Sequence, residues 1–227
     1  MIRRVYRGTL ALAVLLTAAG SVLGQPSELP ATVVTLTGKA EIYRKGDTKW
    51  TPADLRDTLR EGDGIRTSPS VRTTLRTGGG NSIRLAALTQ LFIVPPLGGA
   101  TDPLTVHARL DRGWLWVAVA PGAYAKAPIE VVAGPARVDV RGGVGFRINR
   151  DGSVIVRTYH GDAVVHSSDP AAGWVRSLPE AQELLVPAGS PLPPNRPLSR
   201  EEAEAPWVLW NEEQDYVAYG GKAPQQR

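Results

Sequence analysis

Glycine and proline interrupt this chain so often that long helices are excluded over most of its length: 227 residues include 24 Gly and 19 Pro. From Thr32 onward, short apolar or alternating runs are separated by Gly, Pro, Asn and Asp at the spacing typical of antiparallel sheets. No strong helical period occurs before the C-terminal region. The pattern predicts an all-β fold of two packed antiparallel sheets, arranged as a sandwich or a roll.

The absence of cysteine excludes a disulfide scaffold, a cysteine-based zinc finger and a thiol enzyme. A chain of this length can still fold without such cross-links, because a domain of about 200 residues buries roughly 70% of the surface that its unfolded chain exposes. We therefore expect its stability to come from an ordinary hydrophobic core.

The first 24 residues have the pattern of a secretory signal peptide. Three arginines precede an apolar run at residues 9–19, and small residues follow up to Gly24. The run is shorter than the roughly 20 residues that cross a bilayer. We expect cleavage after Gly24, a linker at residues 25–31 and a periplasmic or secreted protein without a stable transmembrane segment; an uncleaved anchor is the alternative.

Loss of that segment changes the charge of the protein. Residues 1–24 contain three arginines and no acidic residue, so their removal lowers the formal net charge from +4 to +1. Nucleic acid is therefore not expected as a partner, because such binding depends on many cationic contacts with phosphates.

The clearest alternation runs from Arg137 to Asn149. Its apolar side chains fall on one side of an extended chain, and its arginines fall on the other. Glycines at 142, 143 and 145 interrupt the run, which predicts a bulge or a close backbone approach. The glycine triplet at 78–80 lies between two strand-like runs, so it predicts a hairpin and not a phosphate loop.

The composition changes at Pro187, which ends the all-β domain predicted for residues 32–186. Four further prolines predict a stiff linker at 187–198. An amphipathic helix is expected at 199–219, with Ser199 and Glu202 as a capping box and Pro206 opening its second piece. Residues 220–227 form a tail.

Residues 59–67, Leu-Arg-Glu-Gly-Asp-Gly-Ile-Arg-Thr, resemble the L-x-x-G-D-x-I-x-T run of the periplasmic FecR-type domain family. The resemblance covers about residues 32–168, although Gly143 stands where the family usually has Thr, and Gly80-Asn81-Ser82 replaces its acidic-Gly-Ser turn. The chain is similar to the family again at Ser82-Ile83-Arg84-Leu85, Thr89, Leu110, Gly113, Val138-Asp139-Val140-Arg141-Gly142 and Gly161.

Two tryptophans, Trp114 and Trp116, lie two residues apart and so share one face of a predicted strand, while Leu115 and Val117 occupy the other. Either they form an exposed platform for a sugar or a peptide, or another segment covers them. Cover by the C-terminal helix is favoured, because large exposed apolar patches are rare on monomers.

Arg137, Arg141 and Arg147 are predicted to share the polar face of the alternating run. There they could grip an acidic polysaccharide or a lipid headgroup, although a solvated face is the favoured interpretation.

No catalytic, cofactor-binding or metal-ligating residue is predicted. The three histidines, at 107, 160 and 166, are too scattered for a metal site, although His160 and His166 could face each other across a hairpin at Gly161. No serine lies in a nucleophile elbow, and nothing singles out two carboxylates as an acid–base pair.

The resemblance implies an exported, noncatalytic FecR-like protein of the bacterial envelope that binds a protein or a polysaccharide in a scaffold or signalling-associated role. The family's signalling members are similar to anti-sigma regulators with a cytoplasmic helical segment and a transmembrane helix, whose place a signal peptide takes here. A membrane-tethered periplasmic sensor is the alternative, and a glycan-active enzyme is less favoured.

Overall fold

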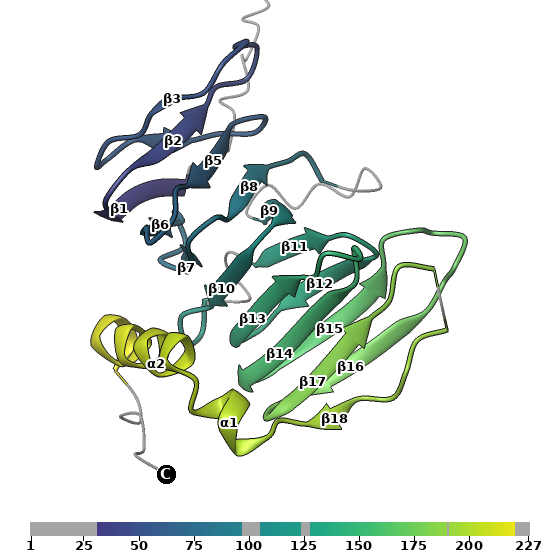
Figure 1. Ribbon diagram of the computed structural model, residues 1–227. Helices are drawn as coiled ribbons and strands as arrows, with labels where there is room; N and C mark the ends of the chain where they lie inside the picture. Colours follow the sequence, from purple (N-terminus) through teal and green to yellow (C-terminus); the bar gives the residue numbers. More distant parts are fainter. Residues whose placement is uncertain (1–30, 97–104, 124–127, 190, 221–227) are drawn as a thin grey trace, which may run out of the picture.

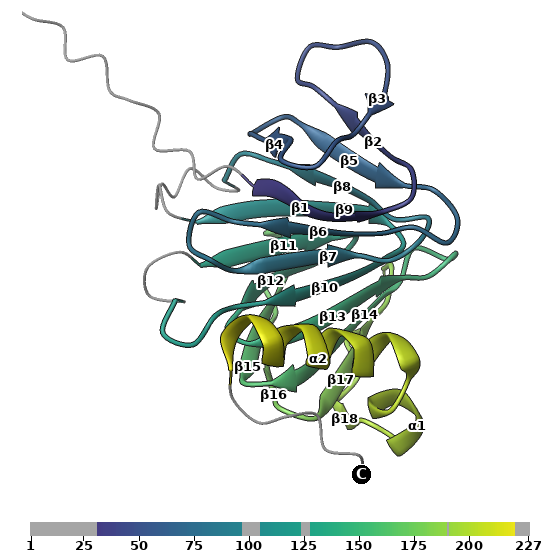
Figure 2. The same ribbon diagram turned by 90° about the vertical axis from the view of Figure 1, so that its left-hand side faces the viewer.

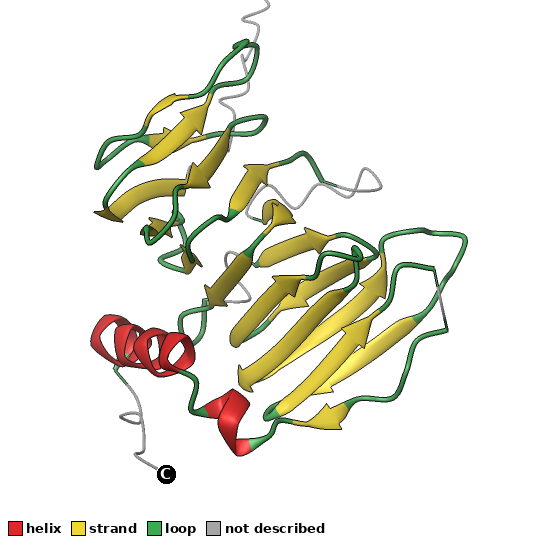
Figure 3. Cartoon of the chain, in the orientation of Figure 1, coloured by secondary structure: helices red, strands yellow, loops and turns green. Residues whose placement is uncertain are grey.

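The computed structural model describes residues 31–96, 105–123, 128–189 and 191–220 (Figure 1). Within these ranges the chain forms two nine-stranded sheets, sheets A and B, and two C-terminal helices (Figure 3). The prediction of an all-β sandwich followed by a C-terminal helix is confirmed. The predicted signal peptide, most of the predicted linker that follows it and the end of the predicted tail lie outside the described residues.

Every described strand belongs to one of the two sheets. Sheet A consists, in spatial order, of β18 (Arg196–Pro197), β17 (Gln182–Val186), β14 (Val154–His160), β13 (Gly143–Ile148), β10 (Trp114–Ala118), β7 (Ser82–Leu85), β6 (Arg72–Arg76), β1 (Ala31–Thr37) and β4 (Thr58–Leu59). Sheet B consists of β16 (Val175–Pro179), β15 (Asp162–Ser167), β12 (Ala136–Val140), β11 (Ile129–Ala133), β9 (Val106–Arg112), β8 (Gln90–Ile93), β5 (Gly64–Thr67), β2 (Ala40–Tyr43) and β3 (Thr51–Pro52). Strands β9 and β11 pair in parallel, and the other described pairs are antiparallel.

The core lies between the inner faces of the two sheets. Leu115 and Val117 of sheet A and Val131 and Val138 of sheet B are fully buried in one apolar cluster. Strands that follow each other in sequence often lie in different sheets, as β9 and β10, β12 and β13, and β14 and β15 do. The chain therefore crosses repeatedly from one layer to the other.

The alternating run from Arg137 to Asn149 is divided between the two sheets, so the prediction of a single strand face was wrong. The chain crosses from β12 to β13 at Arg141–Gly142. The apolar residues on both sides of this crossing are nevertheless buried, because each strand turns its inner face toward the same core. Alternation alone cannot reveal a crossing that preserves the order of inward and outward residues.

The predicted close approach at the glycines of this run is confirmed. A Cβ on Gly142 would lie 2.0 Å from the backbone oxygen of His160. The β13–β14 register shifts between Gly143 and Val144, which is the predicted bulge. The predicted hairpin around residues 78–80 is also confirmed, because β6 and β7 pair across it.

Residues of the 59–67 run support the local backbone. The buried carboxylate of Asp63 accepts hydrogen bonds from the N–H groups of Lys45 and Arg60 at 2.9 and 3.0 Å, and one from Nη1 of Arg44 at 3.1 Å. The hydroxyl of Thr67 accepts the N–H of Thr89 at 2.9 Å. The hydrogen bonds of these two side chains therefore connect neighbouring turns of the backbone.

The C-terminal segment returns to sheet A. Within the predicted linker, Arg196 and Pro197 form β18 beside β17, and Leu192 packs against the core. Two helices follow, α1 (Arg200–Ala203) and α2 (Pro206–Tyr219). The predicted capping box of Ser199 and Glu202 is present, and Pro206 is the first residue of α2, as expected. Among the described residues, no helix is both long and apolar enough to cross a membrane.

Replacing Asp63 by Ala should lower the free energy of unfolding by about 3 kcal/mol, because it removes a buried carboxylate that accepts the N–H groups of Lys45 and Arg60 and pairs with Arg44. Urea denaturation would measure the loss. Asp47→Ala, in the exposed neighbouring turn, is the control and should change stability by less than about 0.5 kcal/mol. Equal losses in the two variants would contradict a supporting role for Asp63.

Candidate functional site

The register of sheet A places its outward-facing side chains in rows that cross the strands. One row contains Arg84 on β7, Trp116 on β10, Gly145 on β13 and Arg157 on β14. The next row toward the start of β10 contains Trp114, Arg147 and Ile155.

Helix α2 lies across the outer face of sheet A (Figures 1 and 2). Its Val208 and Asp215 contact Trp116. Trp116 is fully buried, stacks on Tyr159 with 4.7 Å between ring centroids, and belongs to a cluster with Val208 of the helix. Its Nε1 donates a hydrogen bond to Asp215 at 2.9 Å. The prediction that the C-terminal helix covers both tryptophans is confirmed for Trp116 only, because Trp114 stays partly exposed. At Trp116, Val208 and Asp215 make the central contacts, and Trp207 lies at the edge of the cluster.

Two glycines of β13, Gly143 and Gly145, leave room for the rings of Trp116 and Tyr159 because they carry no side chain. A Cβ on Gly145 would lie 3.1 Å from the ring of Tyr159, and one on Gly143 would lie 3.4 Å from the ring of Trp116. The first contact is tighter than most that a real Cβ makes, and the second is at the short end of ordinary van der Waals contact. The glycines that suggested a backbone feature therefore also let the Trp116–Tyr159 pair sit close to the sheet.

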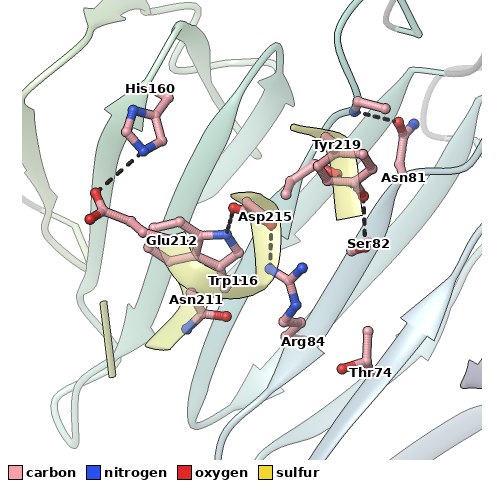
Figure 4. A network of polar contacts seen from close by, with 12 residues as sticks. Thr74, Asn81, Ser82, Arg84, Trp116, His160, Asn211, Glu212, Asp215 and Tyr219 are labelled. Atoms are coloured by element: carbon pink, nitrogen blue, oxygen red, sulfur yellow. Dashed lines mark hydrogen bonds and ion pairs between the residues drawn. The ribbon is translucent and has the colours of Figure 1, made fainter. Parts of the chain in front are cut away.

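A polar network fixes the helix over the sheet (Figure 4). Nη1 of Arg84, which is 2% exposed, donates to Asp215 at 2.5 Å. Burial raises the pKa of Asp215, and Arg84 and Trp116 oppose that rise. At its two ends the network contains the His160–Glu212 pair, with 3.3 Å between Nε2 and Oε1, and the hydroxyls of Tyr219 and Ser82, 2.7 Å apart.

A second network anchors the chain just before α2. Glu202 accepts hydrogen bonds from Arg196 at 2.5 Å and Arg157 at 2.9 Å, and Arg157 also donates to Glu183 at 2.6 Å. Hydrogen bonding to Arg196 lowers the pKa of Glu202 from its usual value of 4.5 to about 2. Burial raises the pKa of the nearby Tyr159 to about 12.

A small pocket opens beside α2 on the outer face of sheet A, over strands β10, β13 and β14. Its lining includes Trp114, Arg147 and Trp207. Arg147 lies over the ring of Trp114 at 4.7 Å. Trp207 stacks on Trp210 with 5.3 Å between centroids, and Arg72 lies 4.9 Å from the centroid of Trp210. We call the surface formed by Trp114, Arg147, Trp207, Trp210 and Arg72 the aromatic groove.

The three arginines predicted to share one face do not do so, and that placement was wrong. Arg137 and Arg141 are on the sheet B side, where they pair with Glu130 and Asp162 at 3.4 and 3.5 Å. Arg147 projects from the outer face of sheet A. The crossing between β12 and β13 separates them.

The histidines are also dispersed. His160 ends β14 in sheet A and His166 lies on β15 in sheet B, so they do not form the facing pair considered from the sequence. His107 contacts Glu130 at 2.9 Å, and His166 contacts Asp139 at 3.1 Å. In the described ranges, no group of three metal-binding side chains comes together.

Sequence reasoning identified Trp114 and Arg147 but missed that they lie together, and it missed Arg72 altogether. Trp207 and Trp210 were considered only as a cover, although their i, i+3 spacing does place them on one side of α2. A second aromatic cluster was missed too: Tyr43, Trp50 and Phe92 contact one another on the side of sheet B, with centroids 5.6 to 6.1 Å apart.

No family model and no curated protein matches the chain. Two crystal structures of a protein from Parabacteroides distasonis, described as a "putative anti-sigma factor", are similar to it, each with 14% sequence identity and a TM-score of 0.49. Each match covers 66% of this chain and 64% of that chain, so this chain spans less than two thirds of that protein's length. A likeness of this size carries no argument about partners or activity.

Replacing Trp116 by Ala should lower the free energy of unfolding by about 3 to 5 kcal/mol, because it removes a fully buried indole from between α2 and the sheet. Trp114→Ala on the same strand is the matched control and should cost less than half as much, since Trp114 is only half-buried. Denaturant melts would measure both losses, and an unchanged midpoint for Trp116→Ala would contradict its burial under the helix.

The Glu202 network should make stability depend on pH in acid. Because the pKa of Glu202 is lowered on folding, its ionised form stabilises the fold above pH 4.5, and this stabilisation is lost as pH falls from 4.5 toward 2. The stability advantage of the wild type over Glu202→Gln should therefore be largest at pH 7 and disappear near pH 2, in denaturant melts across that range.

Glu204→Gln serves as the control for this pH dependence. Glu204 pairs with Arg200, whose side chain is 76% exposed, so its contribution should stay below about 0.5 kcal/mol throughout. An advantage at Glu202 that does not change with pH would count against the lowered pKa.

Proposed function

We propose that this protein is an exported, noncatalytic binding module of the bacterial envelope, which holds a protein or polysaccharide partner at the aromatic groove. One observation carries the proposal. Helix α2 covers Trp116 but leaves its neighbour Trp114 lining a pocket with Trp207, so the sheet and the helix each contribute one wall of an open surface. Half-buried aromatic side chains beside such a pocket are typical of binding sites.

The state of the ionisable groups near the groove supports a noncatalytic role. Glu202 and Glu183 are held in ion pairs with Arg157. The lowered pKa of Glu202 and the raised pKa of Tyr159 both lie far from neutral pH. A general acid or base works best with a pKa near the operating pH, so neither group is suited to that task.

Export and an envelope location rest on the sequence. Residues 1–24 have the order of features that directs secretion, and the FecR-type resemblance implies a domain of the envelope in a signalling-associated or scaffold role. The resemblance and the groove together favour a protein that recognises another envelope component.

A photo-crosslinking residue placed at Leu185 in living cells should give a discrete adduct with one envelope component. Leu185 is 41% exposed on β17 and lies opposite Ile155, in the same row as Trp114 and Arg147. Gel mobility and mass spectrometry of the adduct would identify the partner as a protein or a polysaccharide.

Val175 provides the matched control, because it is an exposed apolar residue on an edge strand of the other sheet. Crosslinking at Val175 should give no such adduct. Identical adducts at both positions, or none at Leu185, would contradict a partner at the groove. Recovery of the protein from the envelope with residues 1–24 still attached would contradict cleavage of the signal segment.

A further inference from the structure

Two arginines at the aromatic groove differ from Arg84 and Arg157 on the same face of sheet A. Arg84 is paired with Asp215, and Arg157 is paired with Glu183 and Glu202. Arg72 and Arg147 are exposed, and no carboxylate of the described ranges lies within ion-pair distance of either. The groove therefore carries two positive charges that the folded chain does not neutralise there.

The tryptophans hold these two guanidinium groups in place. Arg147 lies over Trp114 at 4.7 Å, and Arg72 lies over Trp210 at 4.9 Å. A guanidinium over an indole face still presents N–H groups at its rim, where a carboxylate can accept two parallel hydrogen bonds. Contact with the ring also reduces the conformational freedom that the arginine would lose on binding. Each arginine is therefore preorganised to bind an anionic group.

The spacing of the two arginines selects the shape of the ligand. Arg72 is on β6 and Arg147 is on β13, three strands apart in the order β13-β10-β7-β6. With about 4.8 Å between strands, their backbones are separated by about 14 Å. In an extended peptide, residues i and i+4 lie on the same side about 13 Å apart, whereas in a helix the same two residues are only about 6 Å apart. An extended segment therefore matches the groove.

The surface between the two arginines is apolar. Trp114 lies on β10, between β13 and β6, and the ring of Trp207 lies 5.5 Å from Arg72. In an extended segment the side chain of residue i+2 points to the same side as those of i and i+4. An apolar residue at that position would contact the ring of Trp114 while the two acidic residues reach the arginines.

We propose that the aromatic groove binds an extended polypeptide segment with carboxylates at positions i and i+4 and an apolar side chain at i+2, and that Arg72 and Arg147 each bind one carboxylate. The inference rests on the proposed function and names the chemistry of its partner. A polypeptide is favoured over a sugar chain, because each indole of the groove already has a guanidinium or another indole against it. Less ring face is then left for a sugar to stack on.

The test uses a capped nine-residue peptide with Glu at positions 3 and 7, Leu at position 5 and Ser or Thr elsewhere. Titration of the protein with this peptide, labelled for fluorescence anisotropy, should give saturable binding. Peptides with Gln at both acidic positions, or with the second Glu moved to position 5 and Leu to position 7, should bind at least tenfold more weakly, because one or both ion pairs are lost.

Variants of the protein test the two arginines directly. Arg72→Gln and Arg147→Gln should each weaken binding by about tenfold, with unchanged thermal melts, since both side chains are exposed. Arg66→Gln is the matched control: Arg66 also lies over a tryptophan, Trp50, at 4.6 Å, but it is already paired with Glu41 at 2.7 Å. That variant should bind the peptide as the wild type does.

Several results would overturn the inference: peptide binding that ignores the spacing of the two acids, arginine variants that bind as the wild type does, or tighter binding of oligogalacturonate or of phosphatidylglycerol vesicles than of the peptide. The peptide arms use the wild-type protein, so they decide the matter even if a variant misfolds. Loss of this inference alone would leave the Leu185 adduct intact. Absence of that adduct as well would remove the proposed function.

Discussion

The ion pair between Arg84 and Asp215 is a buried contact that holds the C-terminal helix on the sandwich. Arg84 is almost completely buried, and an unpaired guanidinium in that position would be strongly destabilising. Asp215 also accepts the indole N–H of Trp116, so one carboxylate serves two buried donors from adjacent strands. Because a charge and an indole must both be matched, α2 has one favourable position on the sheet. The same two contacts therefore also fix the geometry of the groove beside α2.

The fold class could be predicted from the sequence because turn residues and alternation are local signals. The hairpin at residues 78–80, the capping box at Ser199 and the start of α2 at Pro206 depend on a few neighbouring residues, and all were predicted. The crossing at Arg141–Gly142 could not be predicted, since two strands that share one core show the same inward and outward order as one long strand.

The site was harder to predict than the fold because its parts come from distant segments. Trp114 was singled out, and the cover over Trp116 was anticipated, but nothing local connects Arg72 with Trp210 or Arg147 with Trp114. These contacts follow from the strand order of sheet A, which brings β6 and β13 to either side of β7 and β10. Sequence could identify the aromatic residues and Arg147, but not Arg72 or the stacking of either arginine on its tryptophan.

The two walls of the groove are formed at very different times in the life of the chain. Trp114 belongs to its middle, whereas Trp207 lies in the last described element. Chains are synthesised from the N-terminus, and structure formed early must wait for later segments. Until α2 docks on sheet A, Trp116 is not covered and the groove lacks the residues that α2 contributes. Recognition at this surface would therefore report that the sandwich has folded and that its final helix has docked, which makes binding a readout of complete folding.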